Sequence, residues 1–356
     1  MKENNYFDDR TIKSELGFDD ILIKPSFTSI EPIDIDLSTK LTRKIKLKIP
    51  IISTPMSNIT ESDMALALAN EGGLGVIHRY MTIEDQINQI KKVKSNDKIT
   101  AASVGVNDKE RAIKISKYTD VLFIETTSAS NKKIFNFVKD LTKQISCDVV
   151  VGNFGTSSNI EEYCDLGISG IKVGVGVGSI CTLQKITGVG RPQISALIDI
   201  FNTVRKYKMP VIADGGIRST GDIVKALAAG ADSVMIGYIL SGTKETPGKI
   251  VKKENKKYKE YNGTLYSFVE IEKDYLETDF KNNFRVEGIS TLVPYKGPVK
   301  TIINIIGKNL KAAFGLIGAK NIQELHEKVE FIQVNKIPGI DVTKDIRVTK
   351  HNFLTF

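Results

Sequence analysis

Cys181 has the clearest chemical potential in the chain, because it lies in a turn that is unusually rich in glycine. The turn reads Gly-Val-Gly-Val-Gly-Ser-Ile-Cys over residues 174–181, it follows a β-branched run, and Gly188 and Gly190 come shortly after it. Backbone N–H groups in such a turn can hold a phosphate, and a thiol beside them is a candidate nucleophile. The segment therefore predicts a cysteine nucleophile over a bound nucleotide.

The remaining cysteines, Cys147 and Cys164, show no CxxC or Cys/His spacing, and the histidines lie far apart. This argues against a disulfide framework and a structural zinc site, and it favours a reducing compartment. A buried apolar role suits these two cysteines better than it suits Cys181.

The formal net charge of +8 comes from lysines scattered among acidic residues. Such a distribution indicates solvated faces rather than a nucleic-acid groove. The first residues, MKENNYFDDR, lack an apolar signal core, and no run of about 18 apolar residues is present. We therefore expect a cytoplasmic protein with neither nucleic acid nor membrane as a partner.

Eight short β-rich runs recur along the chain. They cover residues 49–53, 74–78, 100–104, 121–125, 149–153, 171–175, 211–214 and 233–237. Most are separated by stretches with helical periodicity, such as 61–70, 83–94 and 221–229. This alternation predicts an α/β fold, a (β/α)₈ TIM barrel, and we expect residues 1–356 to form one catalytic domain.

Unusual polar and glycine residues follow the ends of these strands. They are Met56, Glu125, Asn153, the Cys181 loop, Asp214 and Gly237. Barrel enzymes carry their chemistry at the carboxyl ends of the strands, so these positions predict one shared site. The alternative is that glycine and aspartate only mark turns, as they do in any α/β protein.

A long connection with weak periodicity, residues 261–298, follows the eighth strand. Such a connection in a compact domain is either disordered or a mobile active-site element. The side chains of Tyr261, Tyr266, Tyr275 and Glu287 favour the second reading. We predict a mobile flap and a loop that reads the base in this segment.

At these residues the chain resembles the IMP dehydrogenase and GMP reductase family over nearly its whole length. The matching segments are LGFDDILIKP, NEGGLGVIHRYMTIEDQ, KVGVGVGSICTLQKITGVGRPQ, ADGGIRSTGDIVKALAAGADSVMIG and EGISTLVPYKG. In that family a cysteine thiolate attacks C2 of a purine 5'-monophosphate and hydride passes to or from a nicotinamide cofactor. The resemblance implies that Cys181 is the nucleophile, with its pKa lowered by the neighbouring N–H groups.

The same resemblance implies the remaining site residues by position. Phosphate contacts fall to Ser179, Gly216, Gly237 and Tyr261, ribose contacts to Asp214, and base contacts to Met56, Asn153, Gly263 and Glu287, with Tyr238 beside them. Cofactor contacts fall to Glu125, Thr126 and Asn153, and a potassium ion to the carbonyls of Gly176, Gly178 and Cys181. Glu125 stands where the family has an aspartate. Relatives assemble as homotetramers, so we expect a homotetramer here.

The chain departs from the family at the hydrolytic step. Leu183 replaces a threonine that helps to place water or ammonia, and the arginine and tyrosine of the family's flap align with Asp274 and Tyr275. The base-reading loop is Gly-Thr-Leu-Tyr over 263–266, and the carboxylate of Glu287 pairs with a donor on either hypoxanthine or adenine. The purine therefore stays open between IMP and AMP, the latter oxidised to isoguanosine monophosphate.

The resemblance also leaves the branch open. The paired CBS regulatory module is absent after the second strand, which suits reductases and short dehydrogenases equally, whereas ADGGIRSTGD and SGTKETPG favour NAD-dependent oxidation of IMP to XMP. The alternatives are an NADPH-dependent GMP reductase, releasing IMP and ammonia, and a nucleotide-binding protein without turnover. The alternative of a nucleotide-binding protein without turnover is motivated by Leu183, Asp274 and Ser57.

Overall fold

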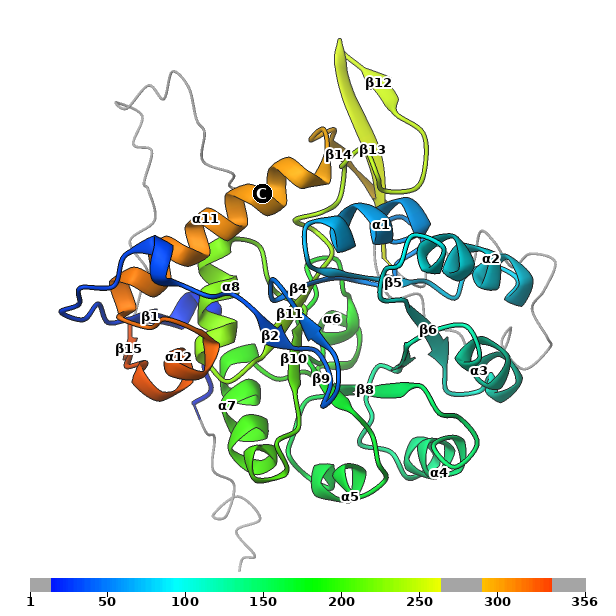
Figure 1. The fold of residues 1–356 in the computed structure, drawn as a ribbon, viewed down its shortest axis with the longest axis horizontal. Helices are drawn as coiled ribbons and strands as arrows, with labels where there is room; N and C mark the ends of the chain where they lie inside the picture. Colours follow the sequence, from blue (N-terminus) through cyan, green and yellow to red (C-terminus); the bar gives the residue numbers. More distant parts are fainter. Residues whose placement is uncertain (1–13, 264–289, 335–356) are drawn as a thin grey trace, which may run out of the picture.

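A computed structural model describes residues 14–263 and 290–334. Eight parallel strands close into a barrel: β4 (Ile51–Ser53), β5 (Leu74–Ile77), β6 (Ala101–Gly105), β7 (Val121–Glu125), β8 (Asp148–Phe154), β9 (Gly170–Val173), β10 (Val211–Asp214) and β11 (Ser233–Ile236). Closure comes from β4, whose Ile52 lies opposite both Leu74 of β5 and Met235 of β11. The predicted (β/α)₈ barrel is confirmed (Figure 1).

Helices surround the barrel. They are α1 (Ser62–Asn70), α2 (Ile83–Lys94), α3 (Lys109–Ser116), α4 (Lys132–Leu141), α5 (Ile160–Cys164), α7 (Gln193–Val204), α8 (Thr220–Ala228) and α11 (Val299–Ile317), with α12 (Ile322–Lys328) after the last. The short helix α6 (Leu183–Thr187) belongs to the loop after β9. Figure 1 shows the longer helices as an outer layer around the strands.

Strand alternation divides the core into two parts. On β7, Val121 and Phe123 point into the barrel, whereas Leu122 and Ile124 pack against the outer helices. A hairpin of β2 (Thr39–Lys40) and β3 (Lys46–Leu47) contributes Leu47 to the interior cluster. This hairpin therefore lies at the end where the strands begin and leaves the carboxyl ends for a site.

Two predicted strand boundaries shift for physical reasons. The first strand begins at Ile51 rather than at residue 49, since Pro50 has no N–H to donate to the ladder. The sixth ends at Val173 rather than at residue 175, because Gly174 has a φ of +147° and turns the chain away. That turn starts the loop that carries Cys181.

Shorter strands lie outside the barrel. The strands β12 (Val251–Lys253), β13 (Lys256–Asn262) and β14 (Ser290–Pro294) form an antiparallel sheet that extends beyond the barrel in Figure 1. The strands β1 (Ile21–Ile23) and β15 (Phe331–Gln333) pair near opposite ends of the described chain. The described residues also include short 3₁₀ turns at Phe18–Asp20, Pro32–Asp34 and Arg205–Tyr207.

One stretch, Val299–Lys328, is long and apolar enough to cross a membrane by length and composition alone. Its first helix, α11, packs against α1 and α8, and its apolar residues Ile302, Ile306 and Leu310 are almost fully buried there. We therefore interpret α11 as an outer helix of the barrel, which satisfies the same test as a membrane span.

Candidate active site

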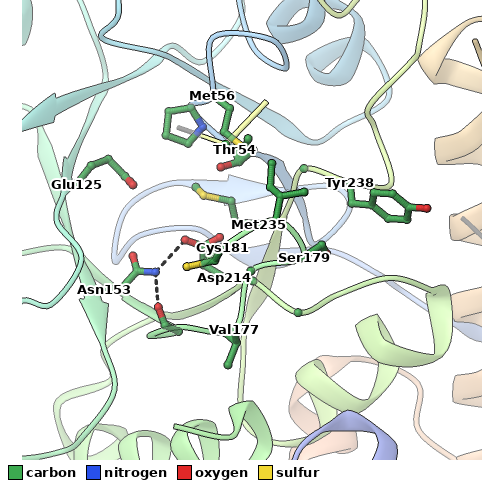
Figure 2. A pocket seen from close by; sticks show the side chains of 18 of the residues that line it. Thr54, Met56, Glu125, Asn153, Val177, Ser179, Cys181, Asp214, Met235 and Tyr238 are labelled. Atoms are coloured by element: carbon green, nitrogen blue, oxygen red, sulfur yellow. Dashed lines mark hydrogen bonds between the residues drawn. The ribbon is translucent and has the colours of Figure 1, made fainter. Parts of the chain in front are cut away.

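A pocket of about 300 Å³ opens at the carboxyl ends of the barrel strands. It brings together every predicted site residue that the structure describes: Met56, Glu125, Thr126, Asn153, Gly176, Gly178, Ser179, Cys181, Asp214, Gly216, Gly237, Tyr238, Tyr261 and Gly263. Figure 2 shows Cys181, Asn153 and Asp214 close together, with Glu125 and Tyr238 on opposite sides of the view. The remaining predicted residues, Asp274, Tyr275 and Glu287, lie outside the described residues, as do positions 264–266.

The Cys181 loop depends on a glycine at its start. A Cβ on Gly174 would lie 1.8 Å from the carbonyl oxygen of Asp214, so only glycine fits between β9 and β10. The loop closes where the N–H of Arg191 donates to the carbonyl of Val175, at 3.2 Å. Between these points, the N–H of Cys181 donates to the carbonyl of Gly178, at 3.1 Å. The thiol is thereby held on a short turn at the pocket wall.

The other two thiols have different surroundings. Cys164 is 4% exposed, and burial raises its pKa to about 11. Burial also raises the pKa of Cys147 to about 11. Neither lines the pocket that contains Cys181. Of the three thiols, Cys181 is the one that lines this pocket, so it is the one that a ligand bound there can reach.

A buried lysine that the sequence reasoning missed joins the polar residues of the pocket. Lys172 is 1% exposed, and its Nζ donates to Asp214 Oδ2 at 2.5 Å, to Glu125 Oε2 at 3.1 Å and to Asn153 Oδ1. Burial works against its charge, but Asp214 and Glu125 raise the pKa of Lys172 above its ordinary value. The ammonium therefore bridges both carboxylates and offsets part of their negative charge.

The signal that could have revealed Lys172 is present in the sequence. It is a charged residue inside the apolar run of β9, between Ile171 and Val173, which both pack against the outer helices. Strand alternation then directs Lys172 into the barrel, where only a paired charge is tolerated.

Asn153 orients the same cluster from the neighbouring strand. Its Nδ2 donates to the carbonyl of Gly174 at 2.6 Å and to Asp214 Oδ2 at 3.0 Å. The amide thereby links the start of the Cys181 loop to the predicted ribose carboxylate. With both polar atoms in use, its orientation is fixed.

Glu125 keeps one oxygen for a ligand. Its Oε1 is buried and has no hydrogen-bond partner among the described residues, while Oε2 accepts from Lys172. Burial raises the pKa of Glu125, partly offset by Lys172. A buried acceptor without a donor is costly, and a ligand hydroxyl can supply the missing donor. The residues at this side of the pocket therefore fit a nicotinamide ribose.

The opposite side of the pocket has side chains packed closely around Gly237. A Cβ on Gly237 would lie 2.9 Å from Thr54 Cγ2, 3.4 Å from Tyr261 Oη and 3.5 Å from Met56 Sδ. Tyr261 is 3% exposed and burial raises its pKa, so its phenol stays a neutral donor. Backbone N–H groups and a phenol are suitable ligands for a phosphate.

Leu183 stands at the first position of α6 and also lines the pocket, 8% exposed. Its apolar side chain supplies no hydrogen bond at this wall of the pocket. Arg79 and Tyr80, which the sequence reasoning also missed, line the pocket after β5, with the guanidinium carbon 5.0 Å from the tyrosine ring centre. The Arg79 guanidinium gives this wall a positive charge, which acts to lower the pKa of Glu125.

The comparison with known proteins agrees with this geometry. The family model described as "IMP dehydrogenase / GMP reductase domain" matches residues 15–340. The chain belongs to this family. The inosine-5'-monophosphate dehydrogenase of Cryptosporidium parvum is 34% identical over 392 aligned residues, covering 95% of this chain and 98% of that protein. Those of Borreliella burgdorferi and Aquifex aeolicus are 33% and 29% identical, covering 91% and 92% of this chain and 95% and 94% of the relatives.

Proposed function

We propose that this family member oxidises a purine nucleoside 5'-monophosphate at C2 with NAD as acceptor, converting IMP to XMP. The observation that carries the proposal is that Cys181 shares one pocket with two carboxylates, Asp214 and Glu125. Each of these carboxylates can accept hydrogen bonds from the hydroxyls of a ribose. The relatives named as inosine-5'-monophosphate dehydrogenases support the choice of substrate.

In this proposal the thiolate of Cys181 adds to C2 of the base, and the hydrogen at C2 leaves as hydride. NAD, when bound, supplies the hydride acceptor. Water then attacks the same carbon and releases XMP and the thiol. Overall, IMP, NAD and water give XMP, NADH and a proton.

The chain's residues position the two ligands for this step. Asp214 accepts from the substrate ribose, and the unpaired Oε1 of Glu125 accepts from the nicotinamide ribose, while Thr126 lies beside it. Lys172 binds both carboxylates and so sets the distance between the riboses. Ser179, Gly216 and Gly237 hold the phosphate, with Tyr261 as a neutral donor.

Potassium and a homotetramer are further parts of the proposal. The carbonyls of Gly176, Gly178 and Cys181 come from one turn at the pocket, and hard oxygen ligands suit such a cation. Salt titration with potassium or sodium tests the first part, and sedimentation tests the second. The three cysteines are free thiols, which suits a cytoplasmic enzyme.

The direct test follows NADH by absorbance while purified protein is incubated with NAD and each of IMP, AMP and GMP. We expect NADH from IMP. NADH from AMP would assign the AMP-specific variant, and NADPH consumption with ammonia release from GMP would assign a reductase. Nucleotide binding without either reaction would contradict catalysis.

The hydrolytic step has a separate test at Asp274, which aligns with the family's flap arginine. We expect Asp274→Arg to raise the rate of XMP formation, because a base that activates water contributes roughly 10²-fold or more. Rapid-quench analysis should show faster decay of the covalent intermediate. Asp274→Ala serves as the control, and an equal gain in that variant would mean that removing the carboxylate is enough.

A further inference from the structure

The loop that carries Cys181 is closed at its base by Arg191. The N–H of Arg191 donates to the carbonyl of Val175, so residues 175–191 form a closed catalytic loop. Arg191 does not line the pocket. Its guanidinium therefore acts on the loop from outside, and its partners decide what the loop is fixed to.

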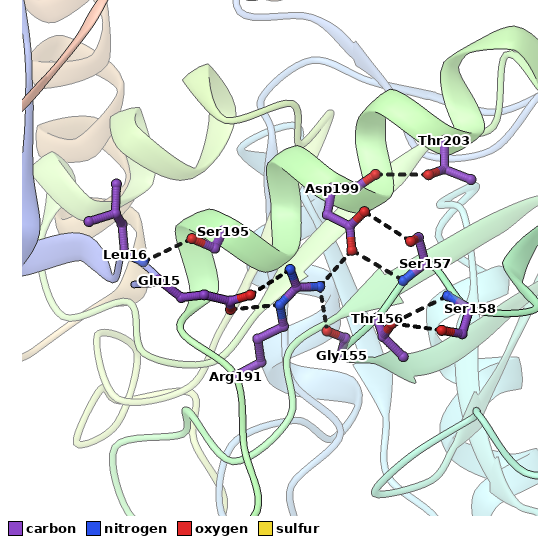
Figure 3. A network of polar contacts seen from close by, with 10 residues as sticks. All are labelled: Glu15, Leu16, Gly155, Thr156, Ser157, Ser158, Arg191, Ser195, Asp199 and Thr203. Carbon is purple, nitrogen blue, oxygen red and sulfur yellow. Dashed lines mark hydrogen bonds and ion pairs between the residues drawn. The ribbon is translucent and has the colours of Figure 1, made fainter. Parts of the chain in front are cut away.

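Those partners form a polar network, drawn in Figure 3. Nε and Nη2 of Arg191 donate to the two carboxylate oxygens of Glu15, at 2.7 and 2.8 Å. Nη1 donates to Asp199 Oδ2 at 2.6 Å and to the carbonyl of Gly155 at 3.2 Å. The planar guanidinium therefore binds one carboxylate along one edge and a second carboxylate through Nη1. The ammonium of a lysine cannot reproduce this arrangement.

Each partner belongs to a different part of the molecule. Asp199 lies on α7, and its carboxylate also accepts from the N–H and hydroxyl of Ser157, at 3.4 and 2.9 Å. Gly155 and Ser157 belong to the loop that follows Asn153 on β8. Arg191 therefore ties the end of the catalytic loop to the loop behind the residue that orients Asp214.

The third partner lies in the segment before β1. Glu15 is held in place by its neighbour Leu16, whose N–H donates to Ser195 Oγ at 2.8 Å and whose carbonyl accepts from the N–H of Ser195 at 3.1 Å. The side chains of Arg191, Glu15 and Asp199 are 24%, 28% and 33% exposed. At this burial a bidentate pair is stronger than an ordinary surface ion pair.

We propose that Arg191 is a positioning residue for the proposed reaction, fixing Cys181 relative to the base through the catalytic loop. Glu15 and Asp199 hold the guanidinium, and the loop after Asn153 is fixed by the same group. The proposal rests on the proposed function for its catalytic consequence only, because the mechanical link exists without ligand.

The test compares Arg191→Met and Arg191→Lys with the wild-type enzyme. The probe is 6-chloropurine riboside 5'-monophosphate. The Cys181 thiolate adds at C2, a proton is taken up at C6, and loss of the C2 proton and of chloride from C6 leaves a C2–S adduct. Misplacement by about 1 Å costs on the order of 10²-fold in rate. We expect the labelling rate at saturation to fall about 100-fold in Arg191→Met and about 10-fold in Arg191→Lys, with the half-saturating concentration changed less than about threefold.

Iodoacetamide labelling of Cys181, followed by peptide mass spectrometry, separates geometry from thiol access. It needs no aligned base, so we expect no slowing in either variant. Equal slowing with both reagents would overturn the proposal, because the thiol would then have lost access or reactivity rather than its alignment.

Arg111 provides a matched control. Its guanidinium is 14% exposed and binds Asp108 at 2.7 Å, with Met81 O and Gln86 Oε1 both at 3.0 Å. We expect Arg111→Met to lower the melting temperature as Arg191→Met does, with labelling unchanged. Wild-type labelling in Arg191→Met, or equal slowing in Arg111→Met, would overturn the proposal.

Hydrogen exchange on ligand-free protein makes the outcome independent of the proposed function. We expect Arg191→Met to speed exchange of amides in residues 176–190 and 155–158 and Arg111→Met to leave them protected. Unchanged exchange in Arg191→Met would show that the Arg191 side chain does not hold the catalytic loop in place. If the wild-type protein forms no NADH from any purine monophosphate, the proposed function is wrong. The exchange result would still show whether Arg191 holds the catalytic loop.

Discussion

Both ends of the barrel contain partly or fully buried carboxylates. The carboxylates at the two ends differ in the hydrogen-bond partners that the protein provides. At the amino end, Asp120 accepts from the N–H and hydroxyl of Thr100, at 2.8 and 2.7 Å, and Asp148 accepts from Thr42 at 2.5 Å. At the carboxyl end, Glu125 keeps a buried oxygen without a partner among the described residues. The protein's own donors satisfy Asp120 and Asp148, whereas Glu125 presents an oxygen that a ligand hydroxyl can satisfy.

This difference indicates where function lies more directly than charge does. A group that the protein satisfies contributes to stability, and a buried group that it leaves unsatisfied stores a cost that binding can recover. Variants at the carboxyl end should therefore change activity most, and variants at the amino end should change stability alone.

The largest effect is expected for Cys181→Ala. Turnover should fall below detection, because the C–S bond cannot form, while the nucleotide dissociation constant stays within about threefold, since phosphate and ribose contacts lie elsewhere. Calorimetric titration with IMP and the NADH assay measure the two properties. Loss of both together would mean that the loop serves structure first.

Lys172→Met is expected to have the next largest effect. It leaves Glu125 and Asp214 without their shared cation, and breaking a buried pair costs roughly 3–5 kcal/mol of stability. Both ligand affinities should fall at least about tenfold. Lys172→Arg should restore only part of the loss, because it keeps the charge but its planar guanidinium does not reproduce the contacts of the buried ammonium.

The pH dependence sharpens this prediction. Burial already raises the pKa of Glu125 and Lys172 opposes the rise, so removing Lys172 raises the pKa further. Less of Glu125 is then ionised at a given pH, and cofactor affinity should recover as pH increases. Calorimetric titration with NAD between about pH 6 and 8.5 measures this, and a pH-independent loss in Lys172→Met would contradict it.

The smallest effect on activity is expected at the amino end, from Asp232→Asn. Burial raises the pKa of Asp232 from 3.8 to about 7 in the folded protein, while its Oδ2 accepts from the N–H of Val211 at 2.9 Å. The folded state therefore binds the proton more tightly, and ionisation costs stability as pH rises from about 4 through 7. Asparagine keeps the acceptor without the charge.

We expect Asp232→Asn to raise the free energy of unfolding by roughly 1–4 kcal/mol at pH 8 and by little at pH 4, with kcat unchanged. Asp120→Asn is the control with the opposite sign. Burial opposes the shift, but hydrogen bonds from Thr100 lower the pKa of Asp120, so its contribution is present at neutral pH and lost in acid. Denaturant titration at both pH values measures the change in the free energy of unfolding for the two variants. A change of the same sign in both variants would contradict the comparison.

Much of the fold was predictable, because strand runs and helical periodicity are local properties. The structure confirms all eight barrel strands within a few residues, and the predicted residues after the strand ends line one pocket. The antiparallel sheet of β12, β13 and β14 was not predicted. Lysines dominate β12 and β13, and such a composition indicates a loop until strand pairing is known.

By itself, the sequence determined the class of fold, the glycine turn around Cys181 and the family, since these depend on residue types at short spacing. Only the tertiary structure decided which charges meet. Lys172 binds Glu125 from 47 positions away, and Arg191 binds Glu15 from 176 positions away. Such contacts depend on barrel closure, which brings distant strand ends together and which no local pattern of residues encodes.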